Sequence, residues 1–203
     1  MKVIVVGGGI VGLSTAYFLG QMGVKSVLIE RDSVGSHASG FAYGGISALG
    51  GMCNPGVLSP IAKEGMKIHL ELANQLSQET GINTEFRYHP SLLLAFTEKE
   101  MSAGKTHANW VSNQDGYCAN WLDAQETQRL EPRISKNILG SVHVEGSADV
   151  EPYKFSLALA HASERLGASI QHGNVIGLRK KTGRITGVLL ENGEISCDVL
   201  VLA

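Results

Sequence analysis

Six residues near the N-terminus, Gly7-Gly8-Gly9-Ile10-Val11-Gly12, fit the pattern G-x-G-x-x-G. The run follows a short apolar stretch and opens a helical pattern, which is the context in which such a turn binds the pyrophosphate of a dinucleotide. In that role Gly7 permits the tight turn, Gly9 lets the pyrophosphate approach the backbone, and Gly12 lets the helix pack closely on the strand. The N–H groups of the helix start, from Ile10 and Val11 onward, then face the phosphates.

An acidic residue, Glu30, follows Gly12 by eighteen positions and ends the next apolar stretch. This spacing is typical of a carboxylate that binds the ribose hydroxyls of a dinucleotide. A glycine-rich turn in an unrelated α/β domain is the alternative interpretation. The agreement of strand, turn, helix and acid favours the dinucleotide site.

The elements that must position these residues follow from the apolar pattern. The runs Val3–Val6 and Ser26–Glu30 predict strands that are buried on both faces, as in a parallel sheet. A helix with a stop at Gly23 joins them into a βαβ unit. Beyond a stretch rich in Gly, Ser and Ala over residues 33–60, which we expect to be ordered backbone packed against a large group, the pattern predicts helices over 61–80, 98–110 and 123–130 and strands over 86–97 and 141–144.

The last fifty residues return to the alternation of helix and strand. Pro152 can open a helix, and Gly167 can close it. We then expect a strand over 169–172, three alternating strands over 175–178, 185–191 and 194–197, and a buried strand over 199–203. The turn Asn192-Gly193 is a strong hairpin signal.

A second cluster follows the acid: Glu30-Arg31, then Gly35-Ser36, Ser39-Gly40 and Gly44-Gly45. Together with the first motif it resembles the flavin-dependent D-amino-acid oxidase superfamily, the group of glycine oxidase, sarcosine oxidase and D-amino-acid dehydrogenase. Asp149-Val150-Glu151-Pro152, followed by a helix, resembles the return of that family from substrate domain to cofactor domain. The resemblance covers the whole chain as the N-terminal portion of a family member.

The resemblance implies an α/β, Rossmann-like FAD-binding fold with a parallel sheet and a crossing β-meander, plus an inserted α+β substrate domain. The expected boundaries are 1–82 and 148–203 for the FAD-binding domain and 83–147 for the insertion. The implied cofactor is FAD rather than NAD, because the chain does not continue directly into another βα unit. The implied cofactor-binding residues are Gly7, Gly9, Ile10, Val11, Gly12, Glu30, Arg31, Ser36, Ser39, Gly40, Gly44, Gly45, Val175 and Ala203.

The same resemblance implies an enzyme that oxidises the C–N bond of an amino acid or N-methyl amino acid, by hydride transfer to flavin and hydrolysis of the imine. The catalytic residues, the electron acceptor and the oligomeric state stay open. The alternatives are an inactive fragment or cofactor-binding module, and another flavoenzyme such as a tRNA-modifying oxidoreductase or a hydroxylase. Because family members continue further, we expect the chain to be truncated after Ala203 and inactive alone.

His37 lies beside the loop that would pass the flavin, and some relatives attach flavin through a histidine in this region. Their histidine aligns nearer Ser39, which argues against a covalent link here. In the insertion, Tyr88, His89, Trp110, Tyr117 and Trp121 are candidates for a substrate pocket or for the core, and Arg87 and Arg133 are candidates for a substrate carboxylate or for the surface.

Composition excludes several other classes of function. Seventeen basic and nineteen acidic residues give a net charge of −2, so electrostatic capture of nucleic acid is not expected. No run is apolar and long enough to predict a membrane span. Three separated cysteines, Cys53, Cys118 and Cys197, predict neither a disulfide framework nor a metal site, and favour a reducing, cytoplasmic compartment.

Overall fold

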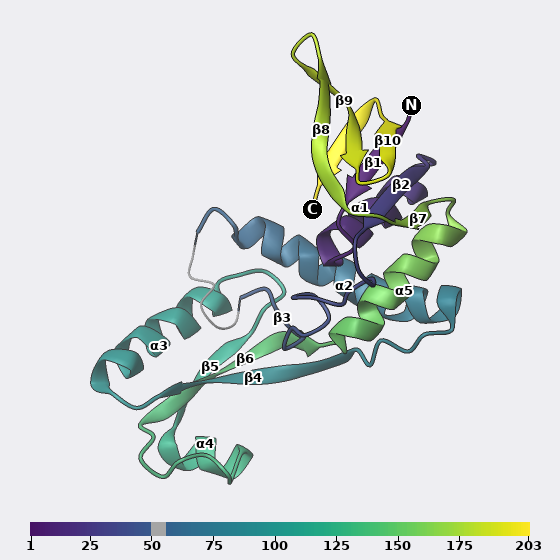
Figure 1. Cartoon of the computed structure of the whole chain (residues 1–203). Coiled ribbons are helices and arrows are strands. Elements are labelled where there is room, and N and C mark those ends of the chain that lie inside the picture. Colours follow the sequence, from purple (N-terminus) through teal and green to yellow (C-terminus); the bar gives the residue numbers. More distant parts are fainter. Residues whose placement is uncertain (50–55) are drawn as a thin grey trace. The chain divides into compact units, whose positions relative to one another are not determined.

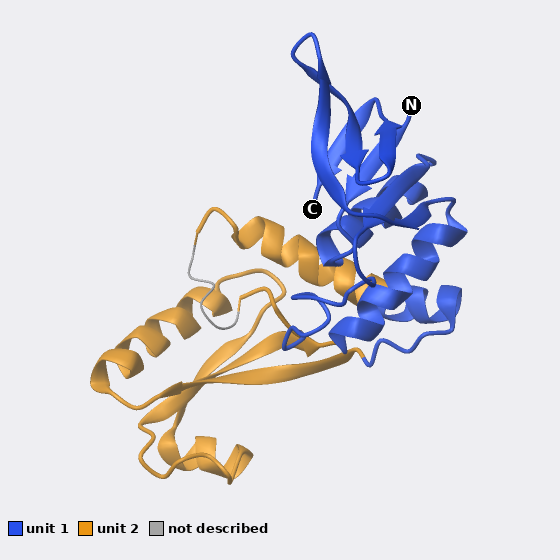
Figure 2. Ribbon diagram, in the orientation of Figure 1, with its two compact units in different colours: residues 1–44, 73–85, 151–203 blue, residues 45–72, 86–150 orange. Residues whose placement is uncertain are grey.

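The computed structural model describes residues 1–49 and 56–203. Cys53 and residues 50–55 of the glycine-rich stretch lie outside the described residues. The chain divides into two compact units, which Figure 2 distinguishes by colour. The first comprises residues 1–44, 73–85 and 151–203, and the second comprises residues 45–72 and 86–150. Each unit is described by itself below.

A four-stranded parallel sheet forms the centre of the first unit (Figure 1). Its strands lie in the order β11 (Val199–Leu202), β1 (Val3–Val6), β2 (Ser26–Glu30) and β7 (Ser169–His172). Every neighbouring pair is parallel. The apolar runs of β1 and β2 are buried, as expected for strands covered on both faces.

Helices α1 (Ile10–Gln21) and α5 (Pro152–Arg165) pack against each other and beside this sheet. α1 buries Leu13, Ala16 and Tyr17 completely. α5 begins where the sequence predicts, because Pro152 occupies its first turn and the Glu151 carboxylate accepts a hydrogen bond from the Lys154 N–H.

The other face of the sheet carries an antiparallel meander of β8 (Val175–Lys181), β9 (Arg184–Leu190) and β10 (Gly193–Ser196). Ile4 and Ile29 of the sheet form a buried cluster with Val188 and Cys197 of the meander region. Burial of these apolar side chains fixes the meander over the sheet. A parallel sheet with a crossing meander is therefore confirmed.

The second unit is built around β6 (Gly140–Asp149), a strand of ten residues. β4 (Arg87–Ala95) pairs with one edge of β6 along its whole length. The other edge is shared by two short strands, β5 (Ala119–Asp123) at one end and β3 (Gly45–Ser47) at the other. All of these pairs are antiparallel.

Two helices of the second unit begin with reciprocal side-chain caps. Thr97 and Glu100 form the capping box of α3 (Glu98–Ser112), and Asp123 and Glu126 form that of α4 (Ala124–Leu130). α3 packs on the sheet, where Val111, Val142 and Val144 are buried. The long helix α2 (Ser59–Thr80) contributes residues 59–72 to this unit and residues 73–80 to the first.

The structure differs from the sequence-based expectation in three strands. β3 lies within a stretch that the sequence does not predict as a strand, β5 is absent from the prediction, and β6 is much longer than the predicted 141–144. The second half of β6 is Glu-Gly-Ser-Ala-Asp, in which Gly146 has φ of +98°, so the apolar alternation that marks a strand is missing. The assignment of residues 83–147 to a substrate domain stays a prediction.

Candidate cofactor site

The glycine turn connects β1 to α1, and its glycines meet different requirements. Gly7 has φ of +110°, and a Cβ there would lie 2.2 Å from the carbonyl oxygen of Ala203. A Cβ on Gly12 would lie 2.0 Å from the carbonyl oxygen of Gly7. Both positions therefore require glycine for the fold itself.

Gly9 is different, because little in the chain fills the space beside it. It is the N-cap of α1 with φ of −79°, a value open to any residue. A Cβ on Gly9 would meet only the Ser39 Oγ, at 3.0 Å. The structure leaves the approach to this backbone open, which is what contact with a pyrophosphate requires.

The Glu30 carboxylate is fixed beside the glycine turn. Oε2 accepts a hydrogen bond from the Gly8 N–H, and Oε1 accepts one from the Asp32 N–H at 2.9 Å. A Cβ on Gly8 would lie 2.9 Å from Glu30 Cγ. The middle glycine of the run is therefore needed for this approach. The acid that ends β2 stays within reach of a ligand at the turn, because its lone pairs exceed these two bonds.

The loop after β2 returns to the same turn. The Gly35 N–H donates to the Gly8 carbonyl at 3.0 Å, and Ser39 Oγ accepts from the Ile10 N–H at 2.9 Å. Ser39 thus satisfies one of the N–H groups that a helix start leaves without an intrahelical partner. The Ser36 Oγ is buried without a hydrogen-bond partner among the described residues.

A cavity of about 400 Å³ lies at the carboxyl ends of β1 and β2. Of the predicted cofactor residues, Gly7, Glu30, Arg31, Val175 and Ala203 line it. Its lining also includes Val6, Ile29, His37, Gly173 and Asn174. The carboxyl edge of a parallel sheet is where doubly wound folds bind ligands.

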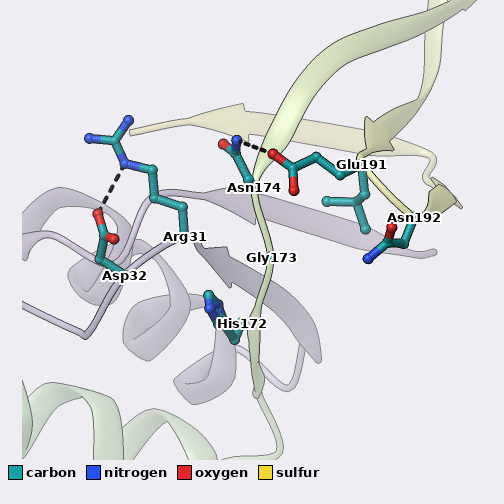
Figure 3. Close-up of a pocket in the computed structure, with 8 residues that line it drawn as sticks. Arg31, Asp32, His172, Gly173, Asn174, Glu191 and Asn192 are labelled. Atoms are coloured by element: carbon teal, nitrogen blue, oxygen red, sulfur yellow. Dashed lines mark hydrogen bonds and ion pairs between the residues drawn. The ribbon is translucent and has the colours of Figure 1, made fainter.

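A second hollow of about 480 Å³ adjoins this cavity and shares Arg31, Gly173 and Asn174 with it. Figure 3 shows the Arg31 guanidinium bonded to Asp32, and Asn174 bonded to Glu191. The two distances are 3.1 and 2.9 Å. His172 and Asn192 complete the polar part of its wall.

The remaining predicted residues lie around the turn, the helix or the loop. Ile10 and Val11 line a shallow hollow along α1, where Val11 is 62% exposed. Gly40 packs so closely on Gly35 that a Cβ would lie 2.0 Å from the Gly35 carbonyl oxygen. Gly44, with φ of +86°, ends the first unit, whereas Gly45 begins β3 in the second.

Most aromatic candidates of the second unit are core residues. Trp110, Tyr117 and Trp121 pack against its buried cluster. Tyr88 is 57% exposed and lines a separate hollow of about 370 Å³ with Tyr117 and residues of α2. Burial, together with the neighbouring Tyr88, raises the pKa of the Tyr117 hydroxyl.

The charged candidates of this unit are already paired. Arg133 binds Glu131 at the surface and lowers the pKa of that carboxyl to about 2. His89 Nε2 lies 2.8 Å from Asp149 Oδ2, and Nδ1 lies 2.8 Å from the Pro90 carbonyl oxygen. The pKa of His89 is raised by the Pro90 hydrogen bond first and by Asp149 second. Arg87 lies directly opposite Asp149 in the sheet register.

Two further observations concern residues 1–49 and 56–203. No helix in this part of the chain is both long and apolar enough to span a membrane. No group of three or more His, Cys, Asp or Glu side chains is arranged there to bind a metal ion. Cys118 and Cys197 are free thiols.

Comparison with known proteins decides the family. The sequence profile described as FAD dependent oxidoreductase matches residues 2–203. The chain belongs to this family. The family resemblance seen in the sequence is thus confirmed, and so is FAD rather than NAD as the cofactor of the family.

Members of the FAD dependent oxidoreductase family with similar sequences include glycine oxidase of Bacillus licheniformis, 31% identical over 201 residues. That match covers 98% of this chain and 53% of the relative. A regulatory subunit of pyruvate dehydrogenase phosphatase from Mus musculus is 30% identical, with 98% and 22% covered. The chain therefore spans about half, or less, of the curated relatives that it matches.

Solved structures agree. Glycine oxidase from Bacillus cereus superposes with a TM-score of 0.88 at 29% identity, covering 100% of this chain and 54% of that one. Glycine oxidase from Geobacillus kaustophilus gives 0.92 at 25% identity, covering 100% and 55%. The arrangement of the FAD-binding fold is therefore shared with these enzymes.

Sequence reasoning missed four residues of the site. Gly8 and Asp32 bond the Glu30 carboxylate through their backbone N–H groups, and Gly173 and Asn174 line the cavity. The third glycine of the run was the available signal for Gly8. Backbone contacts such as that of Asp32 leave no mark in residue type.

Proposed function

We propose that this protein binds FAD in the first unit and that the whole enzyme oxidises the C–N bond of an amino acid or N-methyl amino acid. The observation that carries the proposal is the cavity at the glycine turn, which brings Gly7 and Ala203 together with the Glu30 carboxylate. Similarity to glycine oxidases supports the substrate class. A relative that is 28% identical, a 4-methylaminobutanoate oxidase, supports N-methylated amines as well.

The residues present fit the ADP part of FAD. Gly9 and the start of α1 would bind the pyrophosphate, because backbone N–H groups and the positive helix end favour anions. Glu30 would accept hydrogen bonds from the ribose hydroxyls. Val175, at the start of β8, would place its backbone against adenine. The buried hydroxyl of Ser36 lacks a protein partner among the described residues, and is a further polar group in the predicted binding loop.

The chemistry that bound FAD supplies is acceptance of a hydride from the carbon beside the amine nitrogen, which leaves an imine that water hydrolyses to a carbonyl compound and an amine. The residues of this chain hold and orient the reacting groups. Ser39 and Gly35 tie the loop to the glycine turn and so set the path past the flavin. The proposed scheme requires no side-chain acid or base.

Similarity to a phosphatase regulatory subunit supports a second candidate, a cofactor-binding module without turnover. Other flavoenzymes on this fold, such as a tRNA-modifying oxidoreductase or a hydroxylase, are less favoured because the relatives named above act on amines. The electron acceptor stays open. A cytoplasmic location is part of the proposal and rests on the separated cysteines.

Anaerobic bleaching of the flavin absorbance tests this proposal. The purified protein, loaded with FAD, is mixed with glycine, N-methylglycine, N,N-dimethylglycine, proline and D-alanine in turn. We expect at least one to bleach the flavin and to yield the corresponding carbonyl product. Bound FAD with no bleaching by any amine would favour the non-enzymatic module. Bleaching by an alcohol instead would overturn the proposed C–N chemistry.

A further inference from the structure

His37 lies in the wall of the proposed cofactor cavity, together with Gly7 and Glu30. The family comparison assigns it no role, and the sequence suggested only a covalent flavin link. The cavity lining contains three ionisable side chains, those of Glu30, Arg31 and His37. Any dianionic ligand placed there meets one acid, one permanent cation and one imidazole.

The His37 ring is held by a carboxylate. Nε2 lies 2.7 Å from Asp32 Oδ2, and the same oxygen accepts a hydrogen bond from Arg31 Nε at 3.1 Å. Asp32 is itself fixed to Glu30, because its backbone N–H donates to Glu30 Oε1. The ribose-binding acid, Asp32 and His37 therefore form one connected network at the end of β2.

This network decides which ring nitrogen is available to a ligand. The hydrogen bond from His37, and then that from Arg31, lowers the pKa of Asp32, so Asp32 accepts a hydrogen bond and Nε2 of His37 donates it. Among the described residues, Nδ1 has no protein partner. A protonated imidazole would carry its second N–H at this position.

We propose that His37, positioned by Asp32, donates a hydrogen bond from Nδ1 to the pyrophosphate of the bound cofactor. The inference rests on the proposed FAD site. Negative charge on the pyrophosphate and on Asp32 favours the imidazolium form, so binding takes up a proton. Affinity is then highest at low pH and falls as the imidazole loses its proton.

The groups that face His37 are Asp32 and Arg31, with Glu30 on the same wall; the glycine turn and the start of β8 contribute no charge. Carboxylates and guanidinium groups ordinarily keep their charge between pH 6 and 8. His172 lies in the neighbouring hollow beside Arg31 (Figure 3). A pH effect removed by changing His37 is therefore attributable to His37.

Equilibrium binding of FAD at pH 6 and pH 8 tests the inference in the purified protein, with quenching of flavin fluorescence as the readout. FAD is the right probe because its pyrophosphate does not titrate in this range. We expect His37→Ala to raise Kd about three- to tenfold at pH 6 and less than about twofold at pH 8, since the side chain is exposed and screened. His37→Gln, a neutral donor, should bind equally at both pH values. His161→Ala, an exposed histidine on α5, is the matched control.

The outcomes separate this inference from the proposal beneath it. Wild-type protein that binds FAD, and that loses affinity on Glu30→Gln but not on His37→Ala at pH 6, overturns only the role of His37. Equal loss at both pH values would indicate a structural role of the ring and would also overturn it. Wild-type protein with no affinity for FAD overturns both.

Discussion

Alanine substitutions at Gly9 and Gly12 should separate cofactor binding from folding. A Cβ on Gly12 would lie 2.0 Å from the Gly7 carbonyl oxygen and 3.4 Å from the Ala203 Cβ. Since backbone cannot yield as a flexible side chain does, we expect a cost of about 1–3 kcal/mol in the free energy of unfolding. For a chain of this size that lowers Tm by roughly 3–10 °C.

Gly9→Ala should behave in the opposite way. The new methyl group meets only the Ser39 Oγ at 3.0 Å, a hydroxyl that can rotate, and the backbone angle already suits alanine. We expect the free energy of unfolding to change by less than about 0.5 kcal/mol, the cost of replacing a glycine N-cap. The methyl group would occupy the approach to the backbone, so Kd for FAD should rise by about tenfold or more.

Thermal unfolding without ligand and FAD titration by fluorescence quenching, performed on both variants, check this contrast. The purified wild-type protein is the common reference. If Gly9→Ala bound FAD as tightly as wild type, the pyrophosphate would not lie at this backbone. If Gly12→Ala unfolded at the wild-type temperature, the close packing of α1 on the turn would be wrong.

Three further predictions concern single hydrogen bonds. Glu30→Gln should weaken FAD binding about ten- to a hundredfold in a direct titration, because the carboxylate is the expected ribose acceptor; unchanged affinity would remove Glu30 from the site. Ser39→Ala removes the acceptor of the Ile10 N–H and should cost about 1 kcal/mol in urea unfolding, whereas an unchanged midpoint would show that water replaces it. Because the folded-state pKa of His89 is raised, its bond to Asp149 stabilises the second unit below about pH 6.5 and loses that effect as pH rises through the folded pKa. Asp149→Asn should therefore lower stability by less than about 1 kcal/mol at pH 5.5 and by less at pH 8.5; a larger loss at pH 8.5 would contradict this sign.

The parts of the fold that local sequence specifies were predictable. β1, α1 and β2 follow from two apolar runs separated by glycines, and each signal lies within a few residues of the element it defines. β3 and β5 are short strands whose pairing comes from β6, which is far away in the sequence. No local pattern of three or five residues could specify that partner.

The candidate site shows the same division. Gly7, Gly12 and Glu30 were predictable because each role depends on residue type at a fixed spacing. The bond from Ser39 to the start of α1 and the network from Glu30 through Asp32 to His37 depend on how the loop folds back. Sequence spacing does not encode that return path, so these contacts required the structure.

The central claim is that the first unit binds FAD through its adenosine and pyrophosphate groups. Parallel titrations of the purified protein with FAD and with FMN, followed by flavin fluorescence, test it most directly, because FMN lacks the adenosine that Glu30 and Val175 are proposed to bind. The account predicts that FAD binds at least about a hundredfold more tightly than FMN. Equal affinity for the two flavins, or tighter binding of FMN, would contradict it.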